Sequence, residues 1–311
     1  MDKIPNTANI IGSKVFKYQF IQSIHCNSVL NAHLCRVKYV IDIIILLLSL
    51  DLGFFDKLDV LKYIDLSENA LTSVPEAIQK SSVIQLDLSN QCYLWYQCPS
   101  FTFHLDETSF SKMTSLRVLT MRGILTRIEE ASFSSAIYME ELDVSSIFLS
   151  KIHKNAFLKN KRLRSFRCHQ CWILEPIHHT TWIPLSSLEK LDLSYSPHSI
   201  VSGSHAVEQK QIALYLPNLK YLNLTCSLLI DHDICDSDLY QFEAPLDPDM
   251  LKPLVGLEVL DLSKNGLTSW LHRRFDQNTR LRKLSLQNNK FKILYQAMLD
   301  DFRQLDYLDM R

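Results

Sequence analysis

The residues best suited to chemistry include a Cys-x-x-Cys pair, Cys168 and Cys171, with His169 between them. This spacing is typical of half a zinc site, which needs four thiolate or imidazole ligands in a tetrahedron. The sequence contains no second cysteine pair with such spacing. Both cysteines also fall at inward-facing positions of an apolar repeat. We therefore expect two small buried side chains here and no bound metal.

Four other cysteines form two candidate disulfide pairs, Cys92 with Cys98 and Cys226 with Cys235. Each pair lies within one over-long stretch of the chain. A disulfide there would restrict the unfolded ensemble and stabilise the fold by roughly 2–3 kcal/mol. Spacing alone does not fix the connectivity, so free thiols remain the alternative.

An acidic stretch, residues 231–238, has the sequence DHDICDSD and suggests a calcium loop. It lacks the glycine at the sixth position, and Phe242 stands where the bidentate glutamate would be. We therefore expect a solvated acidic loop. Asn223 begins the sequon Asn-Leu-Thr and is a candidate glycosylation site if the chain is secreted.

The sequence contains no motif of an enzyme active site. GxSxG, P-loop and HExxH patterns are missing, and the eleven histidines are scattered. We therefore predict that the protein is not an enzyme and has no cofactor.

An apolar repeat must position all of these residues. Residues 257–267 and 281–291 both read L-x-x-L-x-L-x-x-N-x-(L/F), and 24 residues separate Leu257 from Leu281. This is the leucine-rich repeat signature, with its known period of about 20–29 residues. Most steps between units fall within one residue of 24. The predicted units begin at Leu61, Val83, Leu116, Met139, Leu163, Leu188, Leu219, Leu257, Leu281 and Leu305.

The L-x-L segment of each unit is expected to be a short strand, because alternate side chains then face opposite sides. A single unit cannot bury its leucines alone, so units must stack into a parallel sheet. The asparagine should turn inward and bond the backbone of adjacent turns. Late in many units an aromatic residue should pack on the convex side: Phe110, Phe133, Phe157, Phe275 and Phe302.

The predicted fold is an α/β leucine-rich repeat solenoid, a curved horseshoe with a parallel β-sheet on the concave face. Its convex side should be irregular or carry short helices. Residues 1–36 show no repeat and are expected to form a leader or an N-terminal cap. Residues 37–311 should form about ten units and end inside the last one, which suggests a fragment of a longer protein.

The outward L-x-L positions should form a column on the concave face, with strands about 4.8 Å apart. Stacked carboxylates repel, and Arg167 between Asp143 and Asp192 should relieve that repulsion. Tyrosines facing the same side would be good interface anchors. The candidate binding surface comprises Tyr63, Asp65, Asp87, Arg122, Asp143, Arg167, Asp192, Tyr195, Tyr221, Asp261, Ser285 and Tyr307.

Composition limits the partners and the location. A formal net charge of -1 over 311 residues argues against a nucleic-acid partner held by bulk charge. The longest apolar run, residues 43–50, is too short to span a membrane, and the N-terminus does not read as a signal peptide. Membrane attachment would therefore need a segment outside this chain. Eight cysteines are more typical of an extracellular protein.

Units of about 24 residues, over-long insertions and loop cysteines resemble the ectodomain of Toll-like receptors from Leu61 to Arg311. The resemblance implies a membrane glycoprotein of innate immunity and signal transduction. It would bind microbial products or a protein ligand and pair with a second subunit. Such a region faces the extracellular space or the endosome. The alternatives are another extracellular repeat protein, secreted or adhesive, and a cytosolic adaptor that binds a protein.

Overall fold

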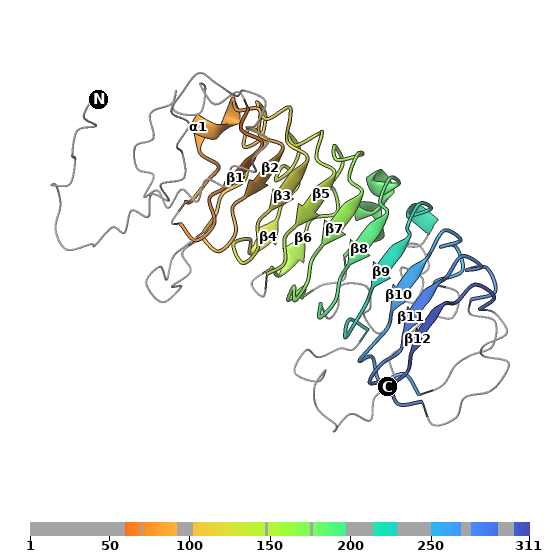
Figure 1. Ribbon diagram of the computed structural model, residues 1–311. Helices are drawn as coiled ribbons and strands as arrows, with labels where there is room; N and C mark the ends of the chain where they lie inside the picture. The colour runs from red at the N-terminus through yellow and green to blue at the C-terminus, as the bar shows by residue number, and fades with distance from the viewer. Residues whose placement is uncertain are drawn as a thin grey trace, which may run out of the picture.

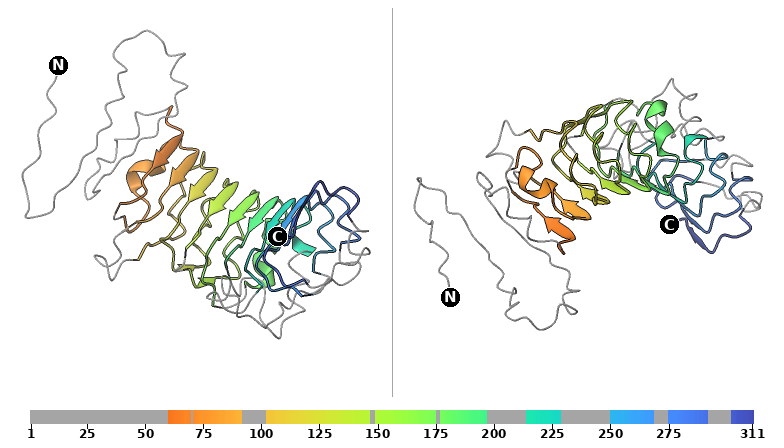
Figure 2. Two further views of the ribbon diagram at one scale, coloured as in Figure 1. Left: turned by 60° about the horizontal axis from the view of Figure 1, so that its bottom comes forward. Right: turned by 90° about the horizontal axis from the view of Figure 1, so that it is seen from above.

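The computed structural model describes residues 60–69, 71–91, 102–146, 149–174, 177–196, 214–228, 250–268, 275–291 and 302–311. In these ranges the chain winds into a curved solenoid with a parallel sheet along the inner side of the arc (Figures 1 and 2). The predicted fold is therefore confirmed. The predicted leader or cap, residues 1–36, and the first degenerate unit lie outside the described residues.

One strand per unit builds the concave sheet. The described residues contribute ten strands to it, in the spatial order of the sequence. They are β1 (Tyr63–Asp65), β2 (Gln85–Asp87), β3 (Val118–Thr120), β5 (Glu141–Asp143), β7 (Ser165–Arg167), β8 (Lys190–Asp192), β9 (Tyr221–Asn223), β10 (Val259–Asp261), β11 (Lys283–Ser285) and β12 (Tyr307–Asp309).

Every strand pairs with the next in the same register. The central residue of one strand lies beside the central residue of its neighbour, as with Leu142 and Phe166 or Leu260 and Leu284. Because side chains alternate along a strand, each central side chain faces the core and its two neighbours face the concave side. Equivalent positions of successive units therefore form continuous files.

Helical structure is sparse and lies away from the concave sheet. The remaining described elements are α1 (Glu76–Gln79), η2 (His179–Thr181), η3 (Ile183–Leu185) and a small second sheet of β4 (Arg127–Ile128) and β6 (Lys151–Ile152). Among the described residues, no helix combines the length and apolar character needed to cross a membrane.

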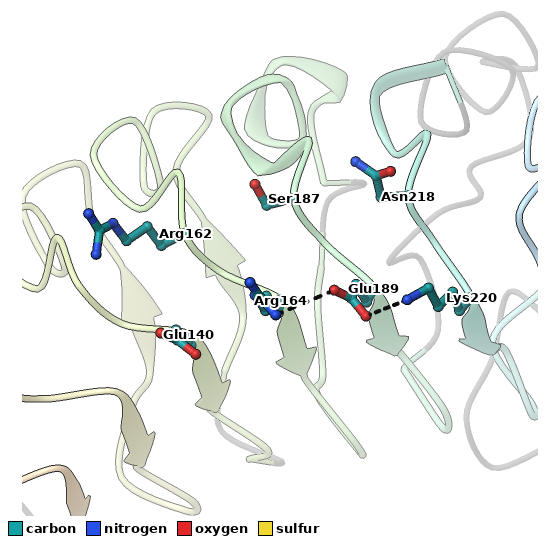
Figure 3. A pocket seen from close by; sticks show the side chains of 7 residues that line it. All are labelled: Glu140, Arg162, Arg164, Ser187, Glu189, Asn218 and Lys220. Carbon is teal, nitrogen blue, oxygen red and sulfur yellow. Dashed lines mark hydrogen bonds and ion pairs between the residues drawn. The ribbon is translucent and has the colours of Figure 1, made fainter.

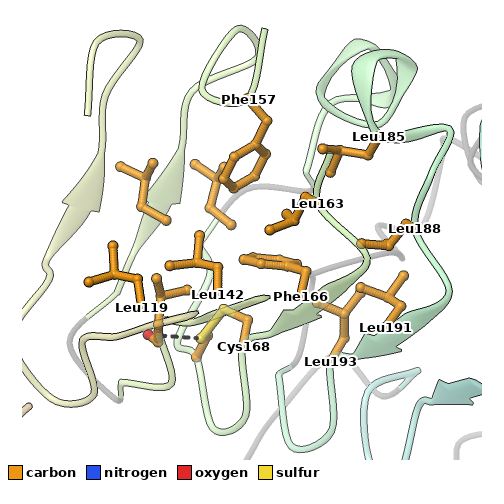
Figure 4. Close-up of a cluster of buried hydrophobic side chains, with 14 of the residues drawn as sticks. Leu119, Leu142, Phe157, Leu163, Phe166, Cys168, Leu185, Leu188, Leu191 and Leu193 are labelled. Carbon is orange, nitrogen blue, oxygen red and sulfur yellow. Dashed lines mark hydrogen bonds between the residues drawn. A yellow bond between two sulfur atoms is a disulfide. The ribbon is translucent and has the colours of Figure 1, made fainter. Parts of the chain in front are cut away.

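The core is one stack of aliphatic side chains with an aromatic row behind it (Figure 4). The rings of Phe110 and Phe133 lie 6.4 Å apart, and those of Phe133 and Phe157 lie 6.1 Å apart, both stacked. The rings of Phe275 and Phe302 lie 5.1 Å apart further along. The predicted aromatic packing between convex segments is thus confirmed, and Trp182 extends it by an edge contact with Phe166.

Inward amides connect the turns, as the repeat predicts. Asn265 is fully buried, and its Oδ1 accepts hydrogen bonds from the backbone amides of Ser227 and Leu228, both at 3.0 Å. Its Nδ2 donates to the carbonyls of Leu224 at 2.8 Å and Leu262 at 3.0 Å. The side chain therefore satisfies polar groups of two successive turns that water cannot reach.

Replacing this amide should be costly. In Asn265→Ala, two buried amide groups lose their acceptor, so the free energy of unfolding should fall by roughly 2–4 kcal/mol. Urea unfolding followed by circular dichroism measures this. The control Asn155→Ala removes an exposed hydrogen bond to Glu130 and should cost less than about 0.5 kcal/mol. Equal losses in the two variants would contradict the role of the inward amide.

Candidate ligand-binding surface

The aspartates of the L-D-L-S motif are anchored by their own unit. Asp143 Oδ1 accepts hydrogen bonds from the amide of Ser145 at 3.0 Å and from its hydroxyl at 2.6 Å. Asp192 makes the same two bonds with Ser194, at 3.0 Å and 2.6 Å. One carboxylate oxygen is thereby fixed at the strand end. The other oxygen is available to side chains of the neighbouring units.

Two arginines use that second oxygen and form a ladder across β3 to β8. Arg122 Nε lies 2.7 Å from Asp143 Oδ2. Arg167 reaches both sides, with Nη1 4.0 Å from Asp143 Oδ2 and Nε 3.3 Å from Asp192 Oδ2. Arg167 therefore lies between the two aspartates, where the sequence placed it.

The ladder shields its carboxylates and exposes its cations. The side chains of Asp143 and Asp192 are 13% and 16% exposed, whereas those of Arg122 and Arg167 are 53% and 45% exposed. A molecule approaching this part of the concave face therefore meets guanidinium groups first. These groups present planar donors suited to carboxylate or phosphate oxygens.

An imidazole, a phenol ring and an ammonium group continue this surface. His169 Nδ1 lies 2.8 Å from Ser194 Oγ, and its ring meets the Tyr195 ring edge to face at 5.5 Å. Lys264 places Nζ 5.5 Å from the centre of the Tyr195 ring. We name the concave cluster by its seven members, Arg122, Asp143, Arg167, His169, Asp192, Tyr195 and Lys264.

The repeat backbone holds Tyr195 and Lys264 in place. Both adopt positive φ, 54° and 57°, at the position that precedes the inward amide of the unit. Their amides donate to the next turn, from Tyr195 to Thr225 O at 2.7 Å and from Lys264 to Gln287 O at 2.8 Å. A left-handed residue turns the chain sharply there, so both side chains are presented at the end of their strand.

Burial sets the protonation of the aromatic groups. Burial lowers the pKa of His169 below its ordinary value, although the Asp192 carboxylate opposes this. Burial also raises the pKa of Tyr221, and Asp192 adds to that effect. The imidazole is therefore mostly neutral at pH 7 and can donate and accept one hydrogen bond each.

Other predicted surface residues lie in the same sheet but outside the cluster. Near the first units, Tyr63 Oη lies 3.4 Å from Asp65 Oδ2, and burial raises the pKa of Asp87. In the last described unit, Arg311 holds the Asp309 carboxylate and lowers its pKa to about 2. The predicted surface thus spans the whole arc, and only part of it gathers at the centre.

The remaining predicted surface residues are distributed between these regions. Asp261 Oδ1 accepts from the amide of Ser263, whose hydroxyl lies 2.7 Å from that of Ser285. Tyr307 is half exposed on β12. These residues contribute single polar groups to the concave face.

His169 and Lys264 were missed by the sequence prediction, which followed only the outward L-x-L positions. Their positions are the two that follow the second core residue of the unit, Cys168 and Leu262 respectively. Counting those positions across units would have placed His169, Tyr195 and Lys264 on one strip of the surface.

The structure corrects the interpretation of Cys168 and Cys171. Both are buried as predicted, but they form a disulfide with Cα atoms 5.6 Å apart (Figure 4). The expectation of two free apolar thiols is therefore wrong, because the adjacent positions bring the sulfur atoms together in the core. A bonded pair offers no thiolate to a metal, and the described residues hold no group of three or more potential ligands.

The other predicted cysteine pairs stay predictions. Cys226 is buried and disulfide-bonded, whereas Cys92, Cys98 and Cys235 lie outside the described residues. Asn223, the candidate glycosylation site, lies on the concave face. Its Oδ1 accepts hydrogen bonds from the amide and hydroxyl of Thr225 at 3.0 Å and 2.8 Å.

A polar hollow of about 410 Å³ lies beside the sheet, on the edge where the chain enters the strands (Figure 3). Within it Lys220 Nζ lies 2.9 Å from Glu189 Oε2, and Arg164 Nη1 lies 3.8 Å from Glu189 Oε1. The hydrogen bond from Lys220 lowers the pKa of Glu189. The lining residues are Glu140, Arg162, Arg164, Ser187, Glu189, Asn218 and Lys220.

Family models match two parts of the chain. The model described as leucine rich repeat matches residues 255–311, and the model described as BspA type leucine rich repeat region matches residues 96–200. No curated protein sequence gives a significant match to this chain.

Two solved structures share the fold. The TLR13–ssRNA13 complex superposes with a TM-score of 0.52 at 18% identity, covering 82% of this chain and 40% of that chain. The Toll–Spatzle complex of Drosophila gives a TM-score of 0.54 at 16% identity, covering 80% of this chain and 31% of that chain. The present chain therefore spans less than half the length of either.

The lowered pKa of His169 gives a direct test of the cluster. An NMR titration of its ring protons, assigned with His169→Gln, should show a midpoint below about 6.5. Asp192→Asn should lower the midpoint further, and Arg167→Ala should raise it, because each removes a charge that acts on the imidazole.

The same shift has a consequence for stability. A histidine with a depressed folded pKa favours folding above its unfolded pKa, and this contribution is lost as pH falls through the folded pKa. Wild type should therefore lose more stability than His169→Gln between about pH 6.5 and the folded midpoint. A midpoint at or above 6.5 would refute the burial of this ring.

Proposed function

Because this chain is a leucine-rich repeat protein whose fold resembles the ectodomains of Toll-like receptors, we propose that it is the ligand-recognition region of such a receptor in innate immunity. It binds a protein ligand or a microbial product through the concave sheet. Binding, and not catalysis, is its activity.

The concave cluster is the observation that carries this proposal. Exposed guanidinium groups over shielded carboxylates, beside one tyrosine ring, offer charge and an aromatic anchor on a rigid sheet. Such a surface complements acidic groups on a ligand, and steering by charge raises association rates. The net charge of -1 favours a protein ligand over a nucleic acid.

The disulfides support an extracellular or endosomal location for this region. A buried disulfide at Cys168 and a bonded Cys226 are typical of proteins that fold in an oxidising compartment. A cytosolic adaptor would keep these thiols reduced. Membrane attachment, glycosylation, pairing with a second receptor subunit and signalling belong to this proposal for the whole protein.

Disulfide mapping tests the proposed location. Non-reducing peptide mapping of protein from its native source should find Cys168 joined to Cys171 in nearly all molecules. Thiol labelling before and after reduction provides the control. A fully alkylated, reduced pair in freshly lysed cells would exclude the extracellular reading and favour the cytosolic adaptor.

A charge and ring substitution tests the binding surface. The variant Arg122→Glu/Arg167→Glu/Tyr195→Ala should lose at least about tenfold in affinity for proteins captured from the extracellular medium, because it reverses the exposed charge and removes the anchor.

The matched control is Arg127→Glu/Lys154→Glu/Lys161→Ala, which changes exposed cations away from the concave sheet. It should bind as wild type does in surface plasmon resonance. Binding lost in the control and kept in the concave variant would place the ligand elsewhere.

A further inference from the structure

A second file of side chains runs along one edge of the solenoid, at the position just after the first leucine of each unit. In eight consecutive units this position is charged, and its sign alternates without exception. The file is Arg117, Glu140, Arg164, Glu189, Lys220, Glu258, Arg282 and Asp306.

The backbone fixes this file as a straight sequence of neighbours. The amide of each member donates to the carbonyl of the member before it, as from Glu140 to Arg117 at 2.8 Å and from Asp306 to Arg282 at 2.9 Å. Successive members therefore follow the strand spacing of about 4.8 Å. Figure 3 shows Glu140, Arg164, Glu189 and Lys220 in this order, each beside the start of its strand.

Pairing within the chain uses only part of the file. Arg117 lies 3.7 Å from Glu140, and Glu189 bonds both Arg164 and Lys220. In contrast, Glu258, Arg282 and Asp306 make no ion pair within 4.0 Å among the residues that the structure describes. Exposed pairs stabilise a fold by about 0–1 kcal/mol at most, so internal stability alone gives a weak reason for strict alternation.

Alternation has a consequence under two-fold symmetry. A two-fold axis that passes between a basic and an acidic member places every basic member opposite an acidic one of the second copy. If the axis lies in the plane of the arc, both copies curve the same way, so contact follows the whole file. Isologous contacts of this kind need a self-complementary surface, and an alternating file is one.

We propose that this edge binds a second copy of the same chain, with the two charged files antiparallel. A file of one sign would need a partner of the other sign, whereas this file matches itself. The polar hollow beside it, lined by Arg162, Ser187 and Asn218, gives room for long side chains of the facing copy. The contact is polar, so screening by salt weakens it.

This edge is separate from the concave cluster, so the inference does not rest on the proposed ligand site. Sedimentation velocity of the full chain should show a concentration-dependent monomer–dimer equilibrium at low ionic strength. Salt near 1 M, where the Debye length is about 3 Å, should raise the dimer dissociation constant by about tenfold or more.

Two variants of single-sign file test the pairing in any register. Glu140→Lys/Glu189→Lys/Glu258→Lys makes the file basic, and Arg164→Glu/Lys220→Glu/Arg282→Glu makes it acidic. Each variant alone should be monomeric because like charges then face each other. An equal mixture should form heterodimers, since every contact is again between opposite charges.

The control keeps the same change in net charge away from the file. Glu107→Lys/Glu129→Lys/Glu130→Lys alters exposed residues and should dimerise as wild type does. Circular dichroism checks the fold of each variant. If a triple variant does not fold, the single variants Glu258→Lys and Arg282→Glu replace it, with the same expectation of weakened self-association and a restored mixture.

Three outcomes would overturn the proposal. Wild type that stays monomeric at low salt would do so, as would single-sign variants that dimerise as wild type does. Monomeric variants that fail to associate when mixed would show that the file does not form the contact. Ligand binding measured in parallel distinguishes failure here from failure of the concave site.

Discussion

Burial of each L-x-L strand between the turns before and after it is the constraint on which the rest of the structure depends. A single turn exposes its leucines, and a stack of turns removes them from water at roughly 1.5–3 kcal/mol each. Leu284, between two strands, is fully buried, whereas Leu308 on the last described strand is 37% exposed. Stability therefore requires neighbours, and neighbours can meet only in matching register.

That register turns a sequence pattern into surfaces. One position per unit builds the concave column, where Arg167 bridges Asp143 and Asp192. Another builds the lateral file, where the sign of charge alternates from Arg117 onward. The solenoid thus presents two polar faces whose chemistry is set independently of its core. A recognition protein needs this separation, because its surface can change without loss of the fold.

The fold could be predicted because leucine spacing reports the core directly. The same counting placed Arg167 between its two aspartates and turned Asn265 inward. The Cys168–Cys171 disulfide escaped prediction because both positions also accept small apolar residues, so the spacing gave no sign of a bond. His169, Tyr195 and Lys264 come together only through the left-handed turn that follows the strand, which leucine spacing does not encode.

The unit lengths explain what else sequence could and could not give. Over-long units announce insertions, but their composition does not dictate a conformation, so the acidic loop 228–250 keeps its predicted solvated character without a site. The lateral file was visible in the sequence, yet its meaning depends on geometry. Only the ladder of backbone bonds shows that its members are direct neighbours.

Native-state hydrogen exchange tests the shared register most directly. The amides of Val144, Cys168, Leu193 and Leu224 each donate to the carbonyl of the next strand, at 2.8–3.0 Å. The account predicts that these amides are all strongly protected, with similar opening free energies, because one continuous core supports them. Exchange of Cys168 or Leu193 at the rate of an unfolded chain, with its neighbours still protected, would contradict a single in-register spine.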